Sequence, residues 1–319
     1  MSLASKINTL AQAIAADIKT LTVQKADVSP TVQLPKQSAG PATITDKVTV
    51  FGRMLAGRVL PTAIPERGSE VPIGAALWRR SFGFMRPYNG GTPWQSFGFA
   101  GVGVVGTGTG RAVTATNTMT RAVRSGVVSA TSAGSLAGMY SFTNFLAAGD
   151  GQGVGGYLYQ TRFAFSDAAT VDGARAFVGL QANISAPANV EPNTLLNCLG
   201  VAQLSGDSSQ LYLVYGGAAA QSAIPLGANF PPMQSTGVAG GTLYDLILYA
   251  PPGENGSVYA RIERVGTQYA AEFTLIPTTP GVQTPGNTTF LSPRWWRGNN
   301  ASALAVGLDV CGFYYEVES

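Results

Sequence analysis

The segment from residue 157 to residue 166 carries aromatic side chains at alternate positions, and this pattern constrains the fold. Its odd positions carry four aromatic residues and one threonine: Tyr157, Tyr159, Thr161, Phe163 and Phe165. A period of two places successive side chains on opposite faces of a β-strand, so the rings share one face. A face this rich in rings needs a second layer to cover it. We therefore expect a β-sandwich.

Short apolar segments continue from residue 125 to the C-terminus. They cover residues 127–128, 199–204, 211–215, 243–249, 258–265, 271–275, 290–296 and 303–317. Gly, Pro, Asn and Asp separate them, as in 251–256. Regular short strands with such turns and no long helix predict a mainly β fold, a jelly-roll sandwich over 125–319. The segment 176–180 follows the aromatic strand after a loop rich in Asp, Thr and Gly, so the two segments are candidates for a hairpin.

The N-terminal part differs in character. Apolar residues recur at near-heptad spacing within 1–24: Leu3, Ile7, Leu10, Ile14 and Leu21. This spacing predicts a helix that serves oligomerisation or anchoring, and the alternative is a helix docked on its own domain. Residues 25–124 are rich in Pro and Gly and predict an extended arm that attaches to a larger assembly. Every lysine lies before residue 48, which marks a boundary between the segments.

An aromatic and arginine-rich junction lies within this arm, with Trp78, Arg79, Arg80 and Trp94. Such residues can stack nucleic-acid bases, but they are also enriched where subunits or domains pack together. The net charge of only +3 provides no basic excess around them. We therefore expect a packed interface here and no nucleic-acid partner.

The letters of a dinucleotide-binding fingerprint occur at 101–106. The fingerprint needs a helix after it and an acidic residue about 20 positions on, to hold a phosphate and a ribose. Here a Thr-rich stretch follows, and the next acidic residue is Asp150. The motif predicts a turn-rich spacer, and we expect no cofactor.

The chain contains no histidine. This excludes Ser-His-Asp and Cys-His catalysis and nearly all zinc sites, and leaves catalysis mainly to carboxylates. The available carboxylates lie mostly in apparent turns, where Asp bonds the local backbone: Asp150, Asp167, Asp172, Asp207, Glu254, Glu263 and Glu272. We expect turn or surface roles for them and no enzyme activity. A calcium site in the loops stays open, although no EF-hand spacing supports it.

Only two cysteines occur, Cys198 and Cys311, in separate expected strands. They could pair, but a lone cysteine commonly behaves as a small core hydrophobe, so free buried thiols are favoured.

The chain carries few charges, at 12% of its residues, and 40 glycines. Such a composition suits extracellular or particle-bound proteins. No apolar run approaches the roughly 18 residues that span a bilayer, and the first residues lack the pattern of a Sec signal peptide. We expect no membrane insertion.

A candidate glycan-binding platform comprises Trp295, Trp296, Arg297 and Asn299. Sugars pack their C–H face on an aromatic ring while amides and arginines bind the hydroxyl groups. In a strand, however, one of two adjacent tryptophans must face the core. A structural role is therefore equally expected for either Trp295 or Trp296 alone.

Several blocks within 125–319 resemble one family, and they occur in the same order: 174–180, 188–192, 197–201, 226–231, 244–252, 296–297 and 303–318. They are similar to the C-terminal domain of tail-fibre and related virion appendage proteins of tailed bacteriophages. The resemblance implies a lectin-like β-sandwich, usually trimeric, that is displayed on the exterior of the particle. It also implies an N-terminal segment that attaches to other virion proteins.

Together these observations predict a non-enzymatic virion protein of the tail-fibre type. We expect a homotrimer that anchors by its N-terminus and binds host cell-surface polysaccharide with the sandwich. One alternative is a head or neck decoration protein that stabilises the particle. A second is a capsule or lipopolysaccharide depolymerase, which requires a cleft with paired carboxylates.

Overall fold

The computed structural model describes residues 102–318 apart from 169 and 233–241. Before residue 102 it describes 46–55, 58–64, 71–72, 80–86 and 95–97, together with residues 9, 12, 34, 36–37, 41–42 and 44. The apolar stripe Leu3, Ile7, Leu10, Ile14 and Leu21 lies outside the described residues, so the predicted N-terminal helix stays a prediction. Trp78, Arg79 and Trp94 lie outside them too, as does the side chain of Arg80.

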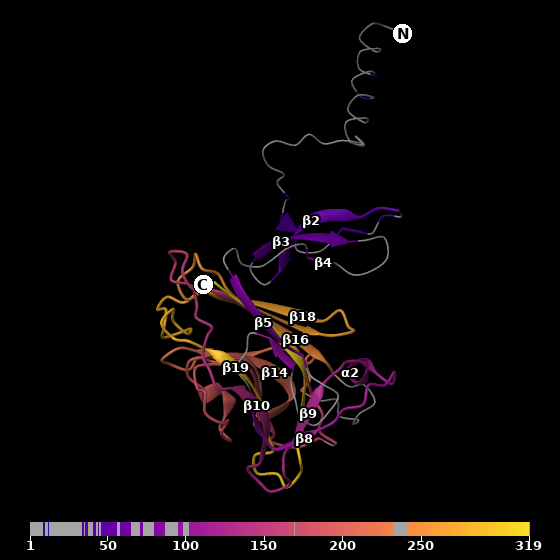
Figure 1. Cartoon of the computed structure of the whole chain (residues 1–319), viewed down its shortest axis with the longest axis vertical. Coiled ribbons are helices and arrows are strands. Elements are labelled where there is room, and N and C mark those ends of the chain that lie inside the picture. Colours follow the sequence, from indigo (N-terminus) through magenta and orange to yellow (C-terminus); the bar gives the residue numbers. More distant parts are fainter. Residues whose placement is uncertain are drawn as a thin grey trace.

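Two antiparallel sheets pack face to face in the main body (Figure 1). In spatial order, the nine-stranded sheet contains β18 (Ala270–Leu275), β17 (Val258–Arg264), β16 (Tyr244–Ala250), β11 (Tyr157–Phe165), β20 (Gly307–Glu318), β5 (Arg80–Arg86) and β6 (Gln95–Phe97), with β9 (Ser125–Val128) and β8 (Thr107–Thr109) beside β20. The seven-stranded sheet contains β15 (Ile224–Pro225), β14 (Asp207–Gly216), β13 (Cys198–Leu204), β12 (Arg175–Gln181), β19 (Ser292–Gly298), β10 (Leu136–Ser141) and β7 (Val102–Val105). The predicted mainly β sandwich is confirmed.

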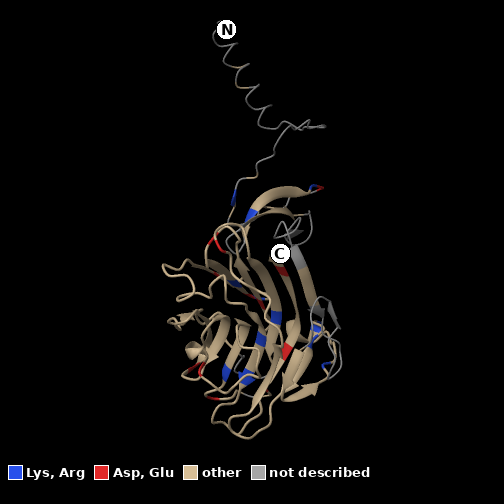
Figure 2. Cartoon of the chain, turned by 60° about the vertical axis from the view of Figure 1, so that its left-hand side comes forward, with Lys and Arg blue, Asp and Glu red and all other residues tan. Residues whose placement is uncertain are grey.

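The core lies between the two sheets. The aromatic positions of β11 face inward, as their alternation predicted, and Tyr159 and Phe163 are fully buried. Val178 of β12 and Trp295 of β19 face them from the opposite sheet. Charged residues are few, at 12% of the chain, and Figure 2 shows most of the sandwich without Lys, Arg, Asp or Glu.

The predicted hairpin between 157–165 and 176–180 is wrong. β11 pairs with β16 and β20, whereas β12 pairs with β13 and β19 in the other sheet. Both strands have strongly apolar inner faces, and opposite positions across the core bury both of these faces at once. The intervening loop crosses between the sheets.

The predicted boundary at residue 125 is also too late. β5 pairs along β20, and β7 pairs along β10, so segments from the expected arm belong to the sandwich. In the sequence, Phe82 and Phe84 of β5 fall within the range of the predicted aromatic junction, and β7 has only 4 residues, one of them glycine, so neither segment stood out as a strand. The chain before them forms a separate sheet of β1 (Lys36–Gln37), β2 (Thr49–Leu55), β3 (Arg58–Ile64) and β4 (Val71–Pro72), which lies above the sandwich in Figure 1.

Within the described ranges after residue 102, helical structure is limited to α2 (Thr118–Arg121) and the 3-10 turn η1 (Pro192–Thr194). Asn117 caps α2, because its Oδ1 accepts from the N–H of Thr120 at 2.8 Å. Met119 packs with Ala164 and Leu243 on the outer face of the nine-stranded sheet. No helix in the described part of the chain is long and apolar enough to cross a membrane.

Candidate functional site

The platform predicted at Trp295, Trp296, Arg297 and Asn299 is not on the surface. All four residues are buried, with exposed fractions of 0%, 1%, 2% and 0%. β19 lies between β10 and β12 in its sheet, and all of its residues are buried, so both of its faces are covered. Trp295 packs on Phe313 in the core, with ring centroids 5.2 Å apart, and Trp296 packs on Phe177 on the other face. The prediction of an exposed glycan-binding platform is therefore wrong.

Arg297 has a structural role instead. Its Nε donates to Asp167 Oδ1 and Oδ2 at 2.7 and 2.8 Å, and its Nη1 donates to Gln203 Oε1 at 2.6 Å. Asp167 also accepts from the N–H of Gly307 on the opposite sheet. Asp167 was predicted in a turn or on the surface, but it is buried because it pairs with Arg297. Asn299 Nδ2 donates to the backbone carbonyls of Ser132 and Leu304.

Two other carboxylates have the predicted turn role. Asp150 Oδ1 accepts from the N–H groups of Gln152 and Val154 at 2.7 and 3.0 Å. Asp207 Oδ1 accepts from the N–H of Ser209 at 2.8 Å. In the part of the chain that the structure describes, no three His, Cys, Asp or Glu side chains gather closely enough to hold a metal ion.

The two cysteines are free, as predicted. Cys198 is buried and Cys311 is partly buried. Burial raises the pKa of each thiol to about 12, because the thiolate would lose its hydration.

Loops at one end of the sandwich enclose a hollow of about 260 Å³. We call it the loop-end hollow. The loop 145–156, the segment 287–290 and the end of β20 form its wall. The polar or exposed side chains that line it are Asp150, Val154, Asn287 and Phe290.

One wall of the loop-end hollow is a glycine-rich loop of fixed shape. Gly151, Gly153 and Gly155 have φ values of 80°, 98° and 76°, which other residues rarely adopt. The N–H groups of Gly151 and Gly153 both donate to the carbonyl of Pro252 at 3.2 Å. At Gly149, a side chain would collide with the neighbouring turn, because a Cβ would lie 2.1 Å from the oxygen of Pro251. The sequence therefore builds a pre-organised loop that holds Asp150.

The opposite wall is held by a short pairing of Leu146 with Leu291. The N–H of Leu146 donates to the carbonyl of Leu291 at 3.1 Å, and the reverse bond measures 2.6 Å. This pairing positions Phe290 at the rim, where 53% of its surface is exposed. Val154 is 69% exposed on the facing loop.

The loop-end hollow combines three chemical groups that suit a hydroxyl-rich ligand. The N–H groups of Val154 and Gln152 stabilise the carboxylate of Asp150 and lower its pKa below the ordinary value. The amide of Asn287 makes no hydrogen bond to any described residue and offers both a donor and an acceptor. Phe290 adds an aromatic face. The sequence indicated the turn at Asp150. It did not predict the site, because these three residues are far apart in the chain. The glycine-rich run at 149–156 is the one sequence feature that indicates an unusual loop here.

Comparison with known proteins shows no matching family model and no matching curated protein. Among solved structures, the chain is similar to peanut lectin with a bound nonapeptide (10% identity over 75% of this chain and 98% of that chain, TM-score 0.46). It is also similar to winged bean acidic lectin complexed with methyl-α-D-galactose (7% identity over 75% of this chain and 99% of that chain, TM-score 0.44). A third similar structure is arcelin-5 of Phaseolus vulgaris (10% identity over 75% of this chain and 99% of that chain, TM-score 0.41). These neighbours are lectins or lectin-like proteins, but such low identities and TM-scores carry no functional argument. The resemblance to phage tail fibres stays a prediction.

Proposed function

We propose that this protein binds carbohydrate in the loop-end hollow. The observation that carries the proposal is the convergence of Asp150, Asn287 and Phe290 on a hollow with a pre-organised glycine-rich wall. An aromatic face next to an acceptor and an amide matches the two sides of a sugar ring, one of C–H groups and one of hydroxyl groups.

In the proposed complex, the apolar face of the sugar packs on Phe290. Its hydroxyl groups donate to the carboxylate of Asp150 and exchange hydrogen bonds with the amide of Asn287. Hydrolysis of a glycosidic bond generally requires two carboxyl groups about 5–9.5 Å apart, and among the described residues that line this hollow Asp150 is the single carboxylate. This supports binding without catalysis.

The biological setting of the proposal comes from the sequence. The resemblance to tail-fibre proteins suggests that the sandwich is displayed on a virion and contacts host cell-surface polysaccharide. In this role the N-terminal part anchors a homotrimer to other virion proteins. Immunogold labelling of intact particles would test the location, and label at the head or neck would contradict a tail-fibre role.

Binding is tested with the full chain and the isolated host polysaccharide, by calorimetry. Asp150→Asn keeps the Oδ1 acceptor that holds the loop but removes the charge, and Phe290→Ala removes the ring. We expect each to weaken binding at least tenfold. Phe142→Ala and Asp172→Ala are matched controls, because Phe142 is equally exposed at 53% and neither residue lines the hollow. Equal affinity of the site variants and the controls would overturn the proposal.

A further inference from the structure

A second hollow of about 320 Å³ lies on the outer face of the nine-stranded sheet. We call it the sheet-face hollow. The side chains that line it come from three adjacent strands: Gln160 and Arg162 of β11, Asp245 of β16, and Cys311 and Tyr314 of β20. It is distinct from the loop-end hollow, and none of the described residues lines both.

An irregularity in the pairing of β11 with β20 creates this hollow. Arg162 pairs with Gly312, but the next residue, Phe163, pairs with Val310, so Cys311 is an extra residue in β20. Such a bulge bends the strand locally. Gly312 has a φ of 126°, which favours glycine, and it contributes no side chain to the sheet surface. The floor of the hollow is thus backbone.

Apolar clusters border the sheet-face hollow on two sides. Tyr314 belongs to one cluster with Leu158 and Tyr249. Cys311 belongs to another, in which Met119 of α2 packs on the sheet. The hollow is therefore shallow and open, with apolar groups beside it.

The polar groups in the sheet-face hollow have unused hydrogen-bonding capacity but a balanced charge. Arg162 Nε and Nη2 donate to the two carboxylate oxygens of Asp245, each at 2.6 Å. This leaves Arg162 Nη1 without a partner among the described residues. Because 44% of the Arg162 side chain is exposed, a ligand can reach it. The amide of Gln160 likewise makes no hydrogen bond to a described residue. The site therefore offers donors and acceptors without a net charge.

We propose that the sheet-face hollow is a second carbohydrate-binding site, specific for neutral sugars. The bidentate partner of Arg162 disfavours an anionic ligand, because Asp245 already neutralises the guanidinium and would repel a second carboxylate or phosphate. A neutral sugar can accept from Arg162 Nη1, exchange hydrogen bonds with Gln160 and pack on the flanking apolar groups. The choice of ligand class rests on the proposed function, whereas the site itself rests on separate residues.

Two sites would make each chain bivalent. Gly312 lines the sheet-face hollow and Val317 lines the loop-end hollow, and both lie on β20. Five residues of a strand span roughly 17 Å. Neighbouring sites on one chain raise the effective concentration of a repeating polysaccharide, so avidity can exceed the affinity of either site by roughly 10²–10⁴.

The test measures the number of sites with free glucose, galactose and mannose, and with glucuronate as the acidic probe, by NMR titration of the full chain. We expect one neutral hexose to shift two separate sets of resonances, around β11 and around the 149–156 loop. Gln160→Ala should abolish only the first set and Asp150→Asn only the second. Gln268→Ala is the matched control, because it removes an exposed glutamine from the turn after β17. Gln160→Glu keeps the size of the side chain but replaces the amide with a carboxylate. It should also reduce the shifts of the resonances around β11.

The outcomes separate the two proposals. A single site that Asp150→Asn removes and Gln160→Ala leaves intact would overturn the second site and keep the proposed function. A single site with the opposite response would overturn the loop-end site. Tighter binding of glucuronate than of the hexoses near β11 would overturn the specificity for neutral sugars, and shifts from none of the four probes would overturn both sites.

Discussion

Two arginine–aspartate pairs, Arg297–Asp167 and Arg162–Asp245, use the same chemistry in opposite surroundings. The first lies between the sheets, with 2% and 0% of its side chains exposed, and the second lies on an outer face, with 44% and 14% exposed. Every nitrogen of the Arg297 guanidinium donates a hydrogen bond, and the group lies 4.4 Å from the ring centroid of Phe165. Arg162 keeps one nitrogen without a described partner. The arginine of the buried pair uses all of its nitrogens in hydrogen bonds within the protein. The arginine of the outer pair keeps a nitrogen that can bind a ligand.

The largest difference between these pairs should appear in stability. Arg297→Met leaves the buried carboxylate of Asp167 without its partner, which costs about 3–5 kcal/mol. Arg162→Met removes an exposed pair, which costs about 1 kcal/mol or less. Urea unfolding followed by tryptophan fluorescence measures both values. Similar costs for the two variants would show that the burial of the pair does not decide its role.

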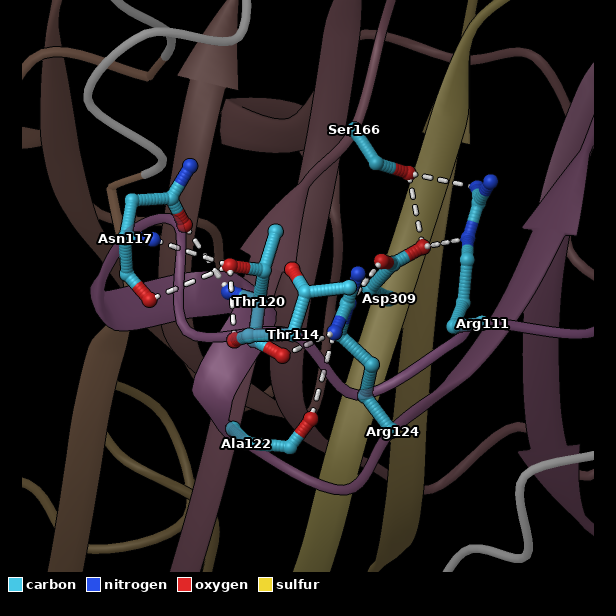
Figure 3. A network of polar contacts seen from close by, with 8 residues as sticks. All are labelled: Arg111, Thr114, Asn117, Thr120, Ala122, Arg124, Ser166 and Asp309. Atoms are coloured by element: carbon cyan, nitrogen blue, oxygen red, sulfur yellow. Dashed lines mark hydrogen bonds and ion pairs between the residues drawn. The ribbon is translucent and has the colours of Figure 1, made fainter.

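A third aspartate sharpens the comparison, because it holds two arginines at once. Asp309 is fully buried and accepts from Arg111 Nε and Arg124 Nε, each at 2.9 Å (Figure 3). These bonds hold the segment 111–124 against the nine-stranded sheet, because Asp309 lies on β20. Asp309→Asn keeps the shape but removes the charge, and the loss of charge-assisted bonds should cost about 1.5–3 kcal/mol.

The same substitution should release the segment 111–124 before the whole chain unfolds. We expect trypsin to cut after Arg111, Arg121 or Arg124 faster in Asp309→Asn than in the unchanged protein. Asp245→Asn is the control, because its arginine partner lies on a strand of the nine-stranded sheet. Unchanged cleavage would show that apolar contacts such as that of Met119 suffice to hold the segment.

The burial of these elements also explains which features the sequence predicted. The alternation in β11 predicted the sandwich because one face of that strand is apolar and buried. Trp295 and Trp296 gave no comparable signal, because β19 is covered on both faces and alternation cannot distinguish a second buried face from an exposed one. The partners Arg297 and Asp167, like Asp150 and Phe290, lie far apart in the sequence. Only the pairing of strands brings them together, so residue patterns could not predict either site.

The proposed binding at the loop-end hollow should depend on pH through Asp150. Its pKa is lowered below 3.8, because the N–H groups of Val154 and Gln152 bind the charged form. The carboxylate is therefore ionised at neutral pH, and binding should be constant down to about pH 4 and fall only below the lowered pKa. The residual, weaker binding of Asp150→Asn, measured at higher ligand concentration, should not show this dependence. A decline in affinity well above pH 4 in the unchanged protein would assign the titration to another group.

The smallest expected effect concerns the two thiols, one in each sheet. With a pKa of about 12, neither Cys198 nor Cys311 is ionised at pH 8, so both should react slowly with a thiol reagent until the chain unfolds. Cys311 should still react faster than Cys198, because it is partly exposed in the sheet-face hollow. A neutral hexose should slow Cys311 and leave Cys198 unchanged, as measured by mass spectrometry of the labelled peptides. If the sugar protects both thiols equally, it stabilises the whole chain, and protection of Cys311 then provides no support for a ligand in the sheet-face hollow.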